Sequence, residues 1–535
     1  MRLVRESQAS TDAAKALTEE QLEKAKSKKP FGKGLLNPPS IIERWVVMDG
    51  GINVSLSELL HPVTKRGTRK LTLANGEQLI IPSCLSMVLE TTDLSQVSPA
   101  MVSDCAVLHF GNDVVQWRSL LDSWLGEVKT MWDCSSTNFQ LLNTLINDTL
   151  PATLDFFSQS GSTFILETDQ TSSEMSKSLA PGLREISSFT RIVGALFDIY
   201  FKRDDGINQD SKDEKEVPES KLSATSPSLS MSSRQASCNT SVLISSIFVF
   251  AYVWGFGGHL HDRYWEKFEA FARHILSRCS VDILVPSDGS IFDYHVDPRQ
   301  GILVPFADKS QEKVKTLPSG YTVIPQMERY SHLVDLLLPT CPVVLCGPPG
   351  VGNQSMLEES LVSKLRPMSV ALNPSLSNKT ATAALTNILP MFFFDDLNCC
   401  SKPLNRGGIP NLELMRQLLS QGGFYNHSSL TFQMLEHFKL LGVCTPSYEP
   451  GVGMGHACHP LSPRLTRLMT VLNFTSPDVE TVLAMHCCNL TNWLEEFPAY
   501  SLAHHQELAK VSVMLLHQRY WLTVTDSDRL LAPFL

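Results

Sequence analysis

The chain has 535 residues, of which 43% are hydrophobic and 19% charged, so it is long enough for several domains with ordinary hydrophobic cores. Its net charge of −10 argues against broad nucleic-acid binding, because such binding needs a basic surface that displaces counterions from phosphates. The 13 cysteines show no C-x-x-C spacing, which favours a reduced, intracellular compartment.

The first part of the chain reads as a polar leader followed by strands and helices. Residues 1–40 have too few apolar positions to define a buried helical face, and no secretory signal opens them. Trp45–Met48 indicate a buried strand with Trp45 in the core. Asn75-Gly76 between two short apolar runs predicts a hairpin turn, and helical stretches are expected around 112–160 and 180–202.

A change of composition marks residues 203–240. Acidic residues give way to serines with almost nothing to bury, so this insertion is predicted to be disordered. Arg234 and Ser237 form an R-x-x-S string that suits a basophilic kinase, although such strings are common by chance. The apolar run at 242–258 is too short and too interrupted to span a bilayer, so we expect a buried helix, with Trp254 in the core and no membrane segment.

A second unit begins near Leu303 and alternates strands with helical or loop sequence. The expected strands are 343–346, 367–372, 391–394 and 438–443, after another helical stretch in RYWEKFEAFARHIL. Strand and helix alternating around a glycine turn is typical of a parallel α/β sheet.

The segment VVLCGPPGVGNQS resembles a phosphate-binding loop that has lost its charge chemistry. Gly347 and Gly352 have the spacing of G-x-x-x-x-G-K-[ST], with Gly350 between them, so backbone N–H groups could cradle phosphates. The lysine position holds Asn353 and the Ser/Thr position holds Gln354. Neither side chain is charged, and Gln354 is a weak substitute for the hydroxyl that holds Mg²⁺. We therefore predict weak or no ATP binding and no efficient hydrolysis.

A carboxylate pair supplies the second half of such a site. The apolar strand MFFF ends at Asp395 and Asp396, at the tip of what we expect to be a neighbouring strand. In a working site one carboxylate, assigned here to Asp395, orients Mg²⁺ through water, and the other positions the attacking water. The glycine turn and the carboxylate pair are each weak signals, but together in an α/β pattern they favour a P-loop fold.

Several longer strings resemble the motor ring of the dynein heavy chain family, in its second and third AAA+ modules. They include WVVMDGGI, NGEQLIIPSCLSMVLETTDLSQVSPAMVSDCAVLHFG and FVFAYVWGFGGHLHDRYWEKFEAFAR, followed in family order by TVIPQMERYSHLVDLLLPTCPVVLCGPPGVG, FFFDDLN and HPLSPRLTRLMTVLNF. The resemblance covers roughly 40–202 and 241–500. It implies an α/β fold built as incomplete tandem AAA+ P-loop modules with parallel sheets and helical small domains.

The resemblance also implies a domain order. After the leader, it gives residues 41–111 as the C-terminal part of a second large domain and 112–302 as a helical small domain that carries the insertion 203–240. Residues 303–480 would form the third large domain, with its degenerate P-loop, and 481–535 the start of the next small domain.

The departures from the family concern charge. Where the second module usually carries a serine-arginine pair, this chain has Ser103-Asp104, so the arginine finger is lost. Arg464 and Arg467 match the R-x-x-R string of the third module and imply a finger that acts on a neighbouring nucleotide. Such decay resembles a divergent branch of the family that is associated with sperm flagella.

These features predict a structural pseudo-ATPase segment of a dynein-like heavy chain that contributes to microtubule-based ciliary or sperm flagellar movement. The alternative is a regulatory ATP-binding module in which Asp395 and Asp396 still manage Mg²⁺; a stand-alone P-loop hydrolase is disfavoured. The resemblance implies other dynein ring modules or subunits as partners and an indirect association with microtubules, without nucleic acid or membrane. It places the chain in the cytoplasm, on the cytoskeleton of a cilium or flagellum. Without a stalk-length heptad pattern, we expect a segment of a longer motor or a shortened isoform.

Two cysteine and histidine clusters have a plainer interpretation. His456, Cys458 and His459 lie within four residues and lack an obvious fourth ligand, so a glycine-rich loop is a better explanation than a metal site. His486, Cys487 and Cys488 lie in helical sequence and are expected to pack.

Overall fold

The computed structural model describes most of residues 43–159, 182–201, 240–306, 326–347, 391–398, 410–446, 461–475 and 479–495, apart from short gaps, with a few residues near 164–166, 315–323 and 507–515. The chain divides into two compact units. Unit 1 comprises Met1–Phe110 with Ser401–Glu413, and unit 2 comprises Gly111–Cys400 with Leu414–Leu535. The leader 1–40, residues 203–239 of the insertion and the expected strand 367–372 lie outside the described residues, whereas Thr240, the last residue of the insertion, begins a helix.

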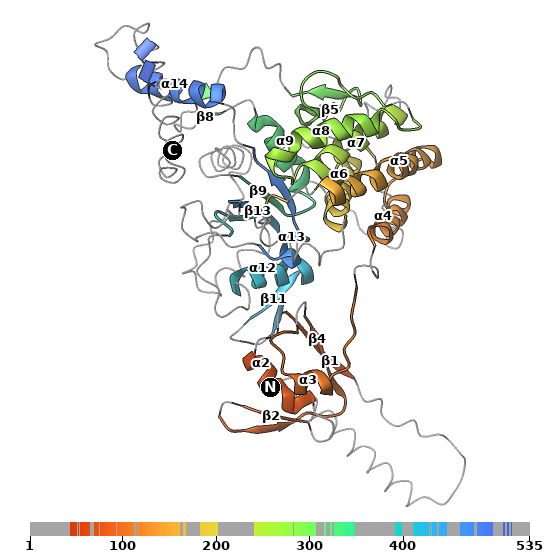
Figure 1. Ribbon diagram of the computed structural model, residues 1–535, viewed down its shortest axis with the longest axis vertical. Coiled ribbons are helices and arrows are strands. Elements are labelled where there is room, and N and C mark those ends of the chain that lie inside the picture. Colours follow the sequence, from red (N-terminus) through yellow and green to blue (C-terminus); the bar gives the residue numbers. More distant parts are fainter. Residues whose placement is uncertain are drawn as a thin grey trace, which may run out of the picture. The chain divides into compact units, whose positions relative to one another are not determined.

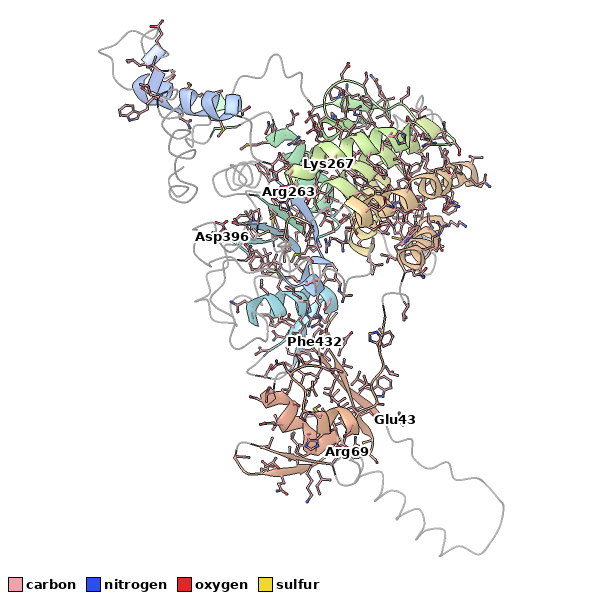
Figure 2. The ribbon with its side chains drawn as sticks, in the orientation of Figure 1. Glu43, Arg69, Arg263, Lys267, Asp396 and Phe432 are labelled. Atoms are coloured by element: carbon pink, nitrogen blue, oxygen red, sulfur yellow. The ribbon has the colours of Figure 1, made fainter. Side chains whose placement is uncertain are left out.

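Unit 1 is built on two parallel strands. β1 (Arg44–Asp49) pairs with β4 (Leu85–Glu90), and between them the chain forms α2 (Val54–Thr64) and the hairpin β2 (Lys70–Thr72)–β3 (Gln78–Ile80). Gly76 has φ +81°, which the predicted hairpin turn requires and glycine accepts without strain. Arg69 donates a hydrogen bond to the carbonyl of Pro82 and ties the two ends of this hairpin together (Figure 2).

One face of the β1–β4 sheet packs on a small core, and side chains on the other face are exposed to solvent. Val46 and Met87 pack on a small core of Val63, Leu79, Ile81 and Leu85. On the opposite face, Trp45 is 69% exposed. The expectation that Trp45 is a core residue is therefore wrong. The period-2 alternation of a strand puts Trp45 and Val46 on opposite faces, and only one face is packed.

The helical part of unit 2 forms most of its core. It consists of α4 (Trp117–Met131), α5 (Ser136–Ser160), α6 (Leu183–Tyr200), α7 (Thr240–Tyr252), the π-helical turn η2 (Val253–Gly257), and α8 (Trp265–Leu276) after the short turn η3 (Asp262–Tyr264). Figure 1 shows α5, α6, α7 and α8 packed against one another, in agreement with their contacts. A turn η4 (Ile291–Asp293), the hairpin β5 (Tyr294–Val296)–β6 (Leu303–Pro305) and the short strands β7 (Lys315–Thr316) and β8 (Thr322–Val323) lead to α9 (Met327–Leu337).

The apolar run at 242–258 is a buried helix, as predicted. The window Thr240–Gly257 is long and apolar enough to cross a membrane by length and composition, but 83% of it is buried within the protein. Trp254 is 1% exposed, which confirms it as a core residue. Gly255 lies so close to α6 that an added Cβ would come within 2.7 Å of the Phe189 Cα, so a larger residue there would push the two helices apart.

A four-stranded parallel sheet forms the rest of unit 2. Its strands are β9 (Val343–Cys346), β10 (Met391–Phe394), β13 (Lys439–Cys444) and β14 (Thr470–Asn473), in the order β10-β13-β9-β14. The strands β9, β10 and β13 confirm three of the expected runs. Between β10 and β13 the chain forms α12 (Pro410–Gln421) and the hairpin β11 (Gly423–Tyr425)–β12 (Phe432–Met434). The one-turn helix α13 (Pro463–Thr466) leads into β14, and α14 (Val479–Glu495) follows.

Candidate functional site

The candidate site lies at the carboxyl edge of the four-stranded sheet. Because all four strands are parallel, the residues that follow β9, β10, β13 and β14 meet at this edge, where ligands of open α/β sheets usually bind. Gly347 follows β9 and Asp395 follows β10. The structure therefore brings the first glycine and the carboxylate pair to the same edge.

One detail of the sequence interpretation is wrong. The strand that ends at Asp395 is not a neighbour of β9, because β13 lies between them and pairs with both. Two strand spacings, about 10 Å in all, thus separate β9 from β10.

Gly347 is the one predicted loop residue that the structure describes. Its N–H donates to the Cys444 carbonyl at 3.1 Å, and the residue is buried. The start of the loop is thus fixed by the end of β13. Gly350, Gly352, Asn353 and Gln354 lie outside the described residues, so their predicted contacts with phosphate remain predictions.

The two carboxylates differ in backbone conformation. Asp395 and Asp396 are both exposed, but Asp396 has φ +48°, the only non-glycine residue with positive φ in the described part of the chain. The left-handed conformation is uncommon outside glycine, asparagine and aspartate, and it clusters at functional sites. It turns the chain sharply after β10, so that Leu397 is again buried and its N–H bonds the Val443 carbonyl at 2.8 Å. Figure 2 labels Asp396 at this edge of the sheet.

Asn398 fixes the tip of β10, a role that sequence reasoning missed. Its side-chain nitrogen donates to the Thr445 carbonyl at 2.6 Å, and its side-chain oxygen accepts from the Thr445 N–H at 3.2 Å. Asn398 is fully buried. The two bonds lock the residue after Asp395-Asp396-Leu397 to the end of β13. A polar residue directly behind an apolar strand and an aspartate pair was the signal available in the sequence.

The predicted arginines lie at the opposite edge of the same sheet. Arg464 and Arg467 belong to α13 and the turn after it, which enter the amino end of β14. The length of a four-residue strand, about 13 Å, separates them from the glycine and carboxylate edge. The structure does not bring them together with Asp395. Their predicted role toward a nucleotide on a neighbouring module is compatible with this place and remains a prediction.

Arg191 of α6 holds the arginine-bearing turn from the helical side. Its guanidinium donates to the carbonyls of Arg467 at 2.6 Å and Met469 at 2.7 Å. Burial lowers the pKa of Arg464, and the neighbouring positive charge of Arg467 lowers it further. Two like charges held side by side create a local preference for an anion. In unit 1, the residue at the family's arginine position, Asp104, instead lies 3.5 Å from His61 Nε2.

Polar contacts of two residues, Asn473 and Arg329, tie the helical part to the carboxyl end of β14. The Asn473 N–H bonds the Gly258 carbonyl at 2.6 Å, and its side-chain nitrogen bonds the Leu260 carbonyl at 2.8 Å. The Arg329 guanidinium, nearly buried, donates to Asp293 at 3.1 Å and to the Thr475 hydroxyl at 2.8 Å. Movement of the edge that carries Gly347 would therefore reach the helices directly.

The described residues hold no cluster of three or more His, Cys, Asp or Glu side chains that could bind a metal. The exposed Asp395 and Asp396 fit a water-mediated Mg²⁺, which would also need oxygen ligands from a phosphate. His456, Cys458 and His459 fall outside the described residues. Cys487 and Cys488 are half-buried in α14.

Comparisons with known proteins agree with this architecture. Residues 219–308 match the family model of the dynein heavy chain AAA lid domain, and residues 390–477 match that of the P-loop containing dynein motor region. Human Dynein heavy chain domain-containing protein 1 is 28% identical over 86% of this chain and 10% of its own length. Human Dynein axonemal heavy chain 6 is 24% identical over 87% of this chain and 10% of its own length.

The similarity extends to an algal protein, the Dynein-1-beta heavy chain of the flagellar inner arm I1 complex of Chlamydomonas reinhardtii, with 24% identity over 82% of this chain and 10% of that protein. The chain thus spans about a tenth of the length of the relatives it matches. Together, the two family models and the parallel sheet confirm the predicted α/β AAA+ fold, and the comparisons show that the chain is similar to the motor region of dynein heavy chains.

Proposed function

We propose that this chain is a structural AAA+ element of a dynein-type motor ring that does not hydrolyse ATP. It works with other ring modules or dynein subunits and, through them, with microtubules of a cilium or sperm flagellum. Names of similar proteins support this place, since they include axonemal and flagellar inner-arm heavy chains.

One observation carries the proposal. The sheet that enters the glycine loop is intact, but Asn353 and Gln354 stand where a phosphate loop has its lysine and its hydroxyl. The lysine neutralises the β- and γ-phosphates, and the hydroxyl holds Mg²⁺, so their loss removes charge stabilisation while leaving the scaffold. Strand β9 is fully buried between β13 and β14, so its packing stabilises the sheet whether or not nucleotide binds.

A regulatory ATP-binding module is the second candidate. It is favoured by the exposed Asp395 and Asp396, which stand at the correct edge of the sheet, and by the positive φ of Asp396. In this alternative, backbone N–H groups of the loop bind phosphate and the carboxylates retain Mg²⁺. Nucleotide would then be bound and hydrolysed slowly or not at all.

Titration of a fluorescent ATP analogue into the full 535-residue chain, with and without Mg²⁺, separates the two candidates. We expect no saturable binding by the native chain. The double substitution Asn353→Lys with Gln354→Thr should create Mg²⁺-dependent binding, and adding Asp395→Asn to it should weaken the Mg²⁺ dependence. The same double variant with Asp288→Asn, an exposed carboxylate far along the chain, is the matched control.

Two results would count against the proposal. Micromolar, Mg²⁺-dependent binding by the native chain would establish the regulatory module instead. If the double variant also fails to bind, while retaining the native circular dichroism spectrum, the two replaced residues are not what disables the loop.

A further inference from the structure

Two cysteines lie side by side directly before the glycine loop. Cys346 is the last residue of β9 and Cys444 is the last residue of β13, and the parallel register pairs them with each other. Figure 1 shows these two strands as neighbours. Neither cysteine is in a disulfide, and among the described cysteines they are the only two that a strand register pairs. The register thus brings two thiols together at the carboxyl edge of the sheet.

The two side chains share one face of the sheet. Val344 and Gly442 are the register partners two residues earlier, and side chains two residues apart on a strand point to the same face. A Cβ added to Gly442 would lie 3.4 Å from Val344 Cγ2, so register partners on this face come within contact distance. The main core lies on the other face and includes Leu345 but neither cysteine.

Backbone hydrogen bonds hold both cysteines in place. The Gly347 N–H donates to the Cys444 carbonyl at 3.1 Å, and the Phe474 N–H donates to the Cys346 carbonyl at 2.7 Å. Both cysteines are 0% exposed. Two groups held in this way react with each other much faster than separate molecules do, because the entropy of bringing them together is already lost on folding.

The spacing of the strands suits a disulfide. Neighbouring strands lie about 4.8 Å apart, and the Cα atoms of a disulfide are about 4.4–6.8 Å apart. The Cβ atoms of a disulfide are about 3.5–4.5 Å apart, so the two strand ends must move together by roughly 1 Å or less. A disulfide closed under such strain is reduced more readily than a relaxed one, which makes it reversible.

We propose that Cys346 and Cys444 form a redox-modification site that a hydroperoxide converts into a disulfide. In the first step the sulfur of one cysteine attacks the peroxide: an S–O bond forms, the O–O bond breaks, and water or an alcohol leaves a sulfenic acid behind. In the second step the other sulfur attacks the sulfenic sulfur: the S–S bond forms, the S–O bond breaks and water leaves. The two thiols lose two electrons and two protons, and the hydroperoxide accepts them. A small, neutral peroxide suits buried thiols, because it reaches them when the strand ends open briefly.

The disulfide ties the start of the glycine loop to the end of β13. Gly347 follows Cys346 directly, and its N–H already bonds the Cys444 carbonyl. Oxidation therefore restricts the opening of the edge on which Asp395 also stands. This inference concerns the two thiols, so it goes beyond the proposed function and holds whether or not the loop binds nucleotide.

Disulfide mapping of the full chain tests the proposal. The reduced chain is treated with hydrogen peroxide, the remaining thiols are alkylated in denaturant, and the peptides are analysed by mass spectrometry with and without dithiothreitol. We expect the 346–444 cross-link to exceed that of any other cysteine pair at least about tenfold, because the register holds these two thiols together. The same oxidation in urea, where the register is lost, should abolish this preference.

Two variants and hydrogen exchange sharpen the test. Cys346→Ala should remove the cross-link and leave the sulfenic acid of Cys444 open to trapping by dimedone. Cys134→Ala, at a partly exposed cysteine of the helical part, should leave the 346–444 cross-link unchanged. In the oxidised native chain, amide exchange at Gly347 and Phe474 should slow several-fold and recover with dithiothreitol.

Three results would overturn the inference. They are the absence of a 346–444 cross-link in the folded, oxidised chain, an equal preference for this cross-link in urea, and sulfinic acid as the main product on either cysteine. The native chain supplies all three measurements, so none of them depends on the folding of a variant. They are also independent of the nucleotide titration that tests the proposed function.

Discussion

Residues 98–110 (SPAMVSDCAVLHF) of unit 1 and residues 462–474 (SPRLTRLMTVLNF) of unit 2 align without gaps. Leu108 and Leu472 occupy the same position of this alignment, yet Leu472 is fully buried and Leu108 is 80% exposed. The two segments are identical at 5 of 13 positions, including Val107, Leu108 and Phe110, yet one ends in a core strand and the other is exposed. In unit 2, β9 brings the partner backbone and four apolar side chains, whereas among the described residues of unit 1 no strand lies beside residues 106–110. Local pattern selects what a segment can become, and the neighbouring strand decides whether it does so.

The polar contacts differ in the same direction. In unit 2, the buried Asn398 and Asn473 and the half-buried Arg191 fix the ends of the strands. In unit 1, the helix α3 (Pro99–Asp104), which corresponds to α13, has the partly exposed contact between Asp104 and His61. A sheet that is closed by its neighbours can bury polar groups with their partners, whereas an open sheet leaves them in water.

The largest effect on the free energy of unfolding should come from Phe474, the last residue of the segment 462–474. Phe474→Ala removes a ring that is 1% exposed and stacks on Tyr330 with centroids 4.4 Å apart, so it should lower the free energy of unfolding by about 3–5 kcal/mol. Phe110→Ala, in the exposed segment of unit 1, should change it by about 0.5 kcal/mol or less. Urea unfolding followed by tryptophan fluorescence measures both. Equal costs for the two substitutions would show that residues 106–110 are packed in solution.

A pH dependence comes next and belongs to unit 2. Burial by itself would raise the pKa of Glu185. The hydrogen bond and charge of His259, 3.3 Å away, together with the charge of Arg184, outweigh this effect of burial and lower the pKa from an ordinary 4.5 to about 2. The folded state then binds fewer protons than the unfolded state between these values. Glu185 therefore stabilises the fold above pH 4.5 by about 3 kcal/mol, at about 1.4 kcal/mol per pH unit, and this is lost as pH falls toward 2.

Urea midpoints of the native chain and of Glu185→Gln at pH 6, 4 and 3 test this. The difference between the two proteins should shrink as the pH falls. Asp104→Asn is the control from unit 1, because its partner His61 and Asp104 itself are 36% and 28% exposed and such pairs contribute little. A difference that stays constant with pH would mean that folding does not lower the pKa of Glu185.

The smallest of the three effects concerns the tip of β10. Asn398→Ala leaves the partly buried N–H and carbonyl of Thr445 without their side-chain partner and should cost about 1–3 kcal/mol. It should also speed hydrogen exchange at the Thr445 amide. Asn147→Ala, which removes an exposed hydrogen bond from Arg118, is the control and should change stability by about 0.5 kcal/mol or less. Unchanged exchange at Thr445 would show that other contacts hold the strand end.

Part of the candidate site could be predicted from the sequence. The apolar runs at 343–346 and 391–394 become strands, and Gly347 and Asp395 meet at one edge because both strands are parallel. Sequence patterns did not reveal that β13 lies between them, nor that Asn398, Asn473 and Arg329 hold that edge. These three act on residues that are far away in the chain, such as Thr445, Leu260 and Asp293, so no local pattern marks them.

The exposure of Trp45 is another feature that the sequence did not predict, because it depends on packing between distant segments. An apolar strand with a tryptophan predicts burial, because a ring gains free energy when it leaves water. Which face of the strand is covered depends on the elements packed against it, and in unit 1 the covered face carries Val46.

By itself, the amino-acid sequence determined strands β9, β10 and β13, the hairpin turn at Gly76, the buried helix around Trp254 and the loss of charge at Asn353 and Gln354, because each depends on the residues themselves or on their neighbours in the chain. Tertiary structure alone decided the strand order, the separation of Arg467 from Asp395 by the length of the sheet, and the exposure of Leu108. Those features depend on hydrogen bonds and packing between distant segments, and a strand becomes part of a core only when another backbone lies beside it.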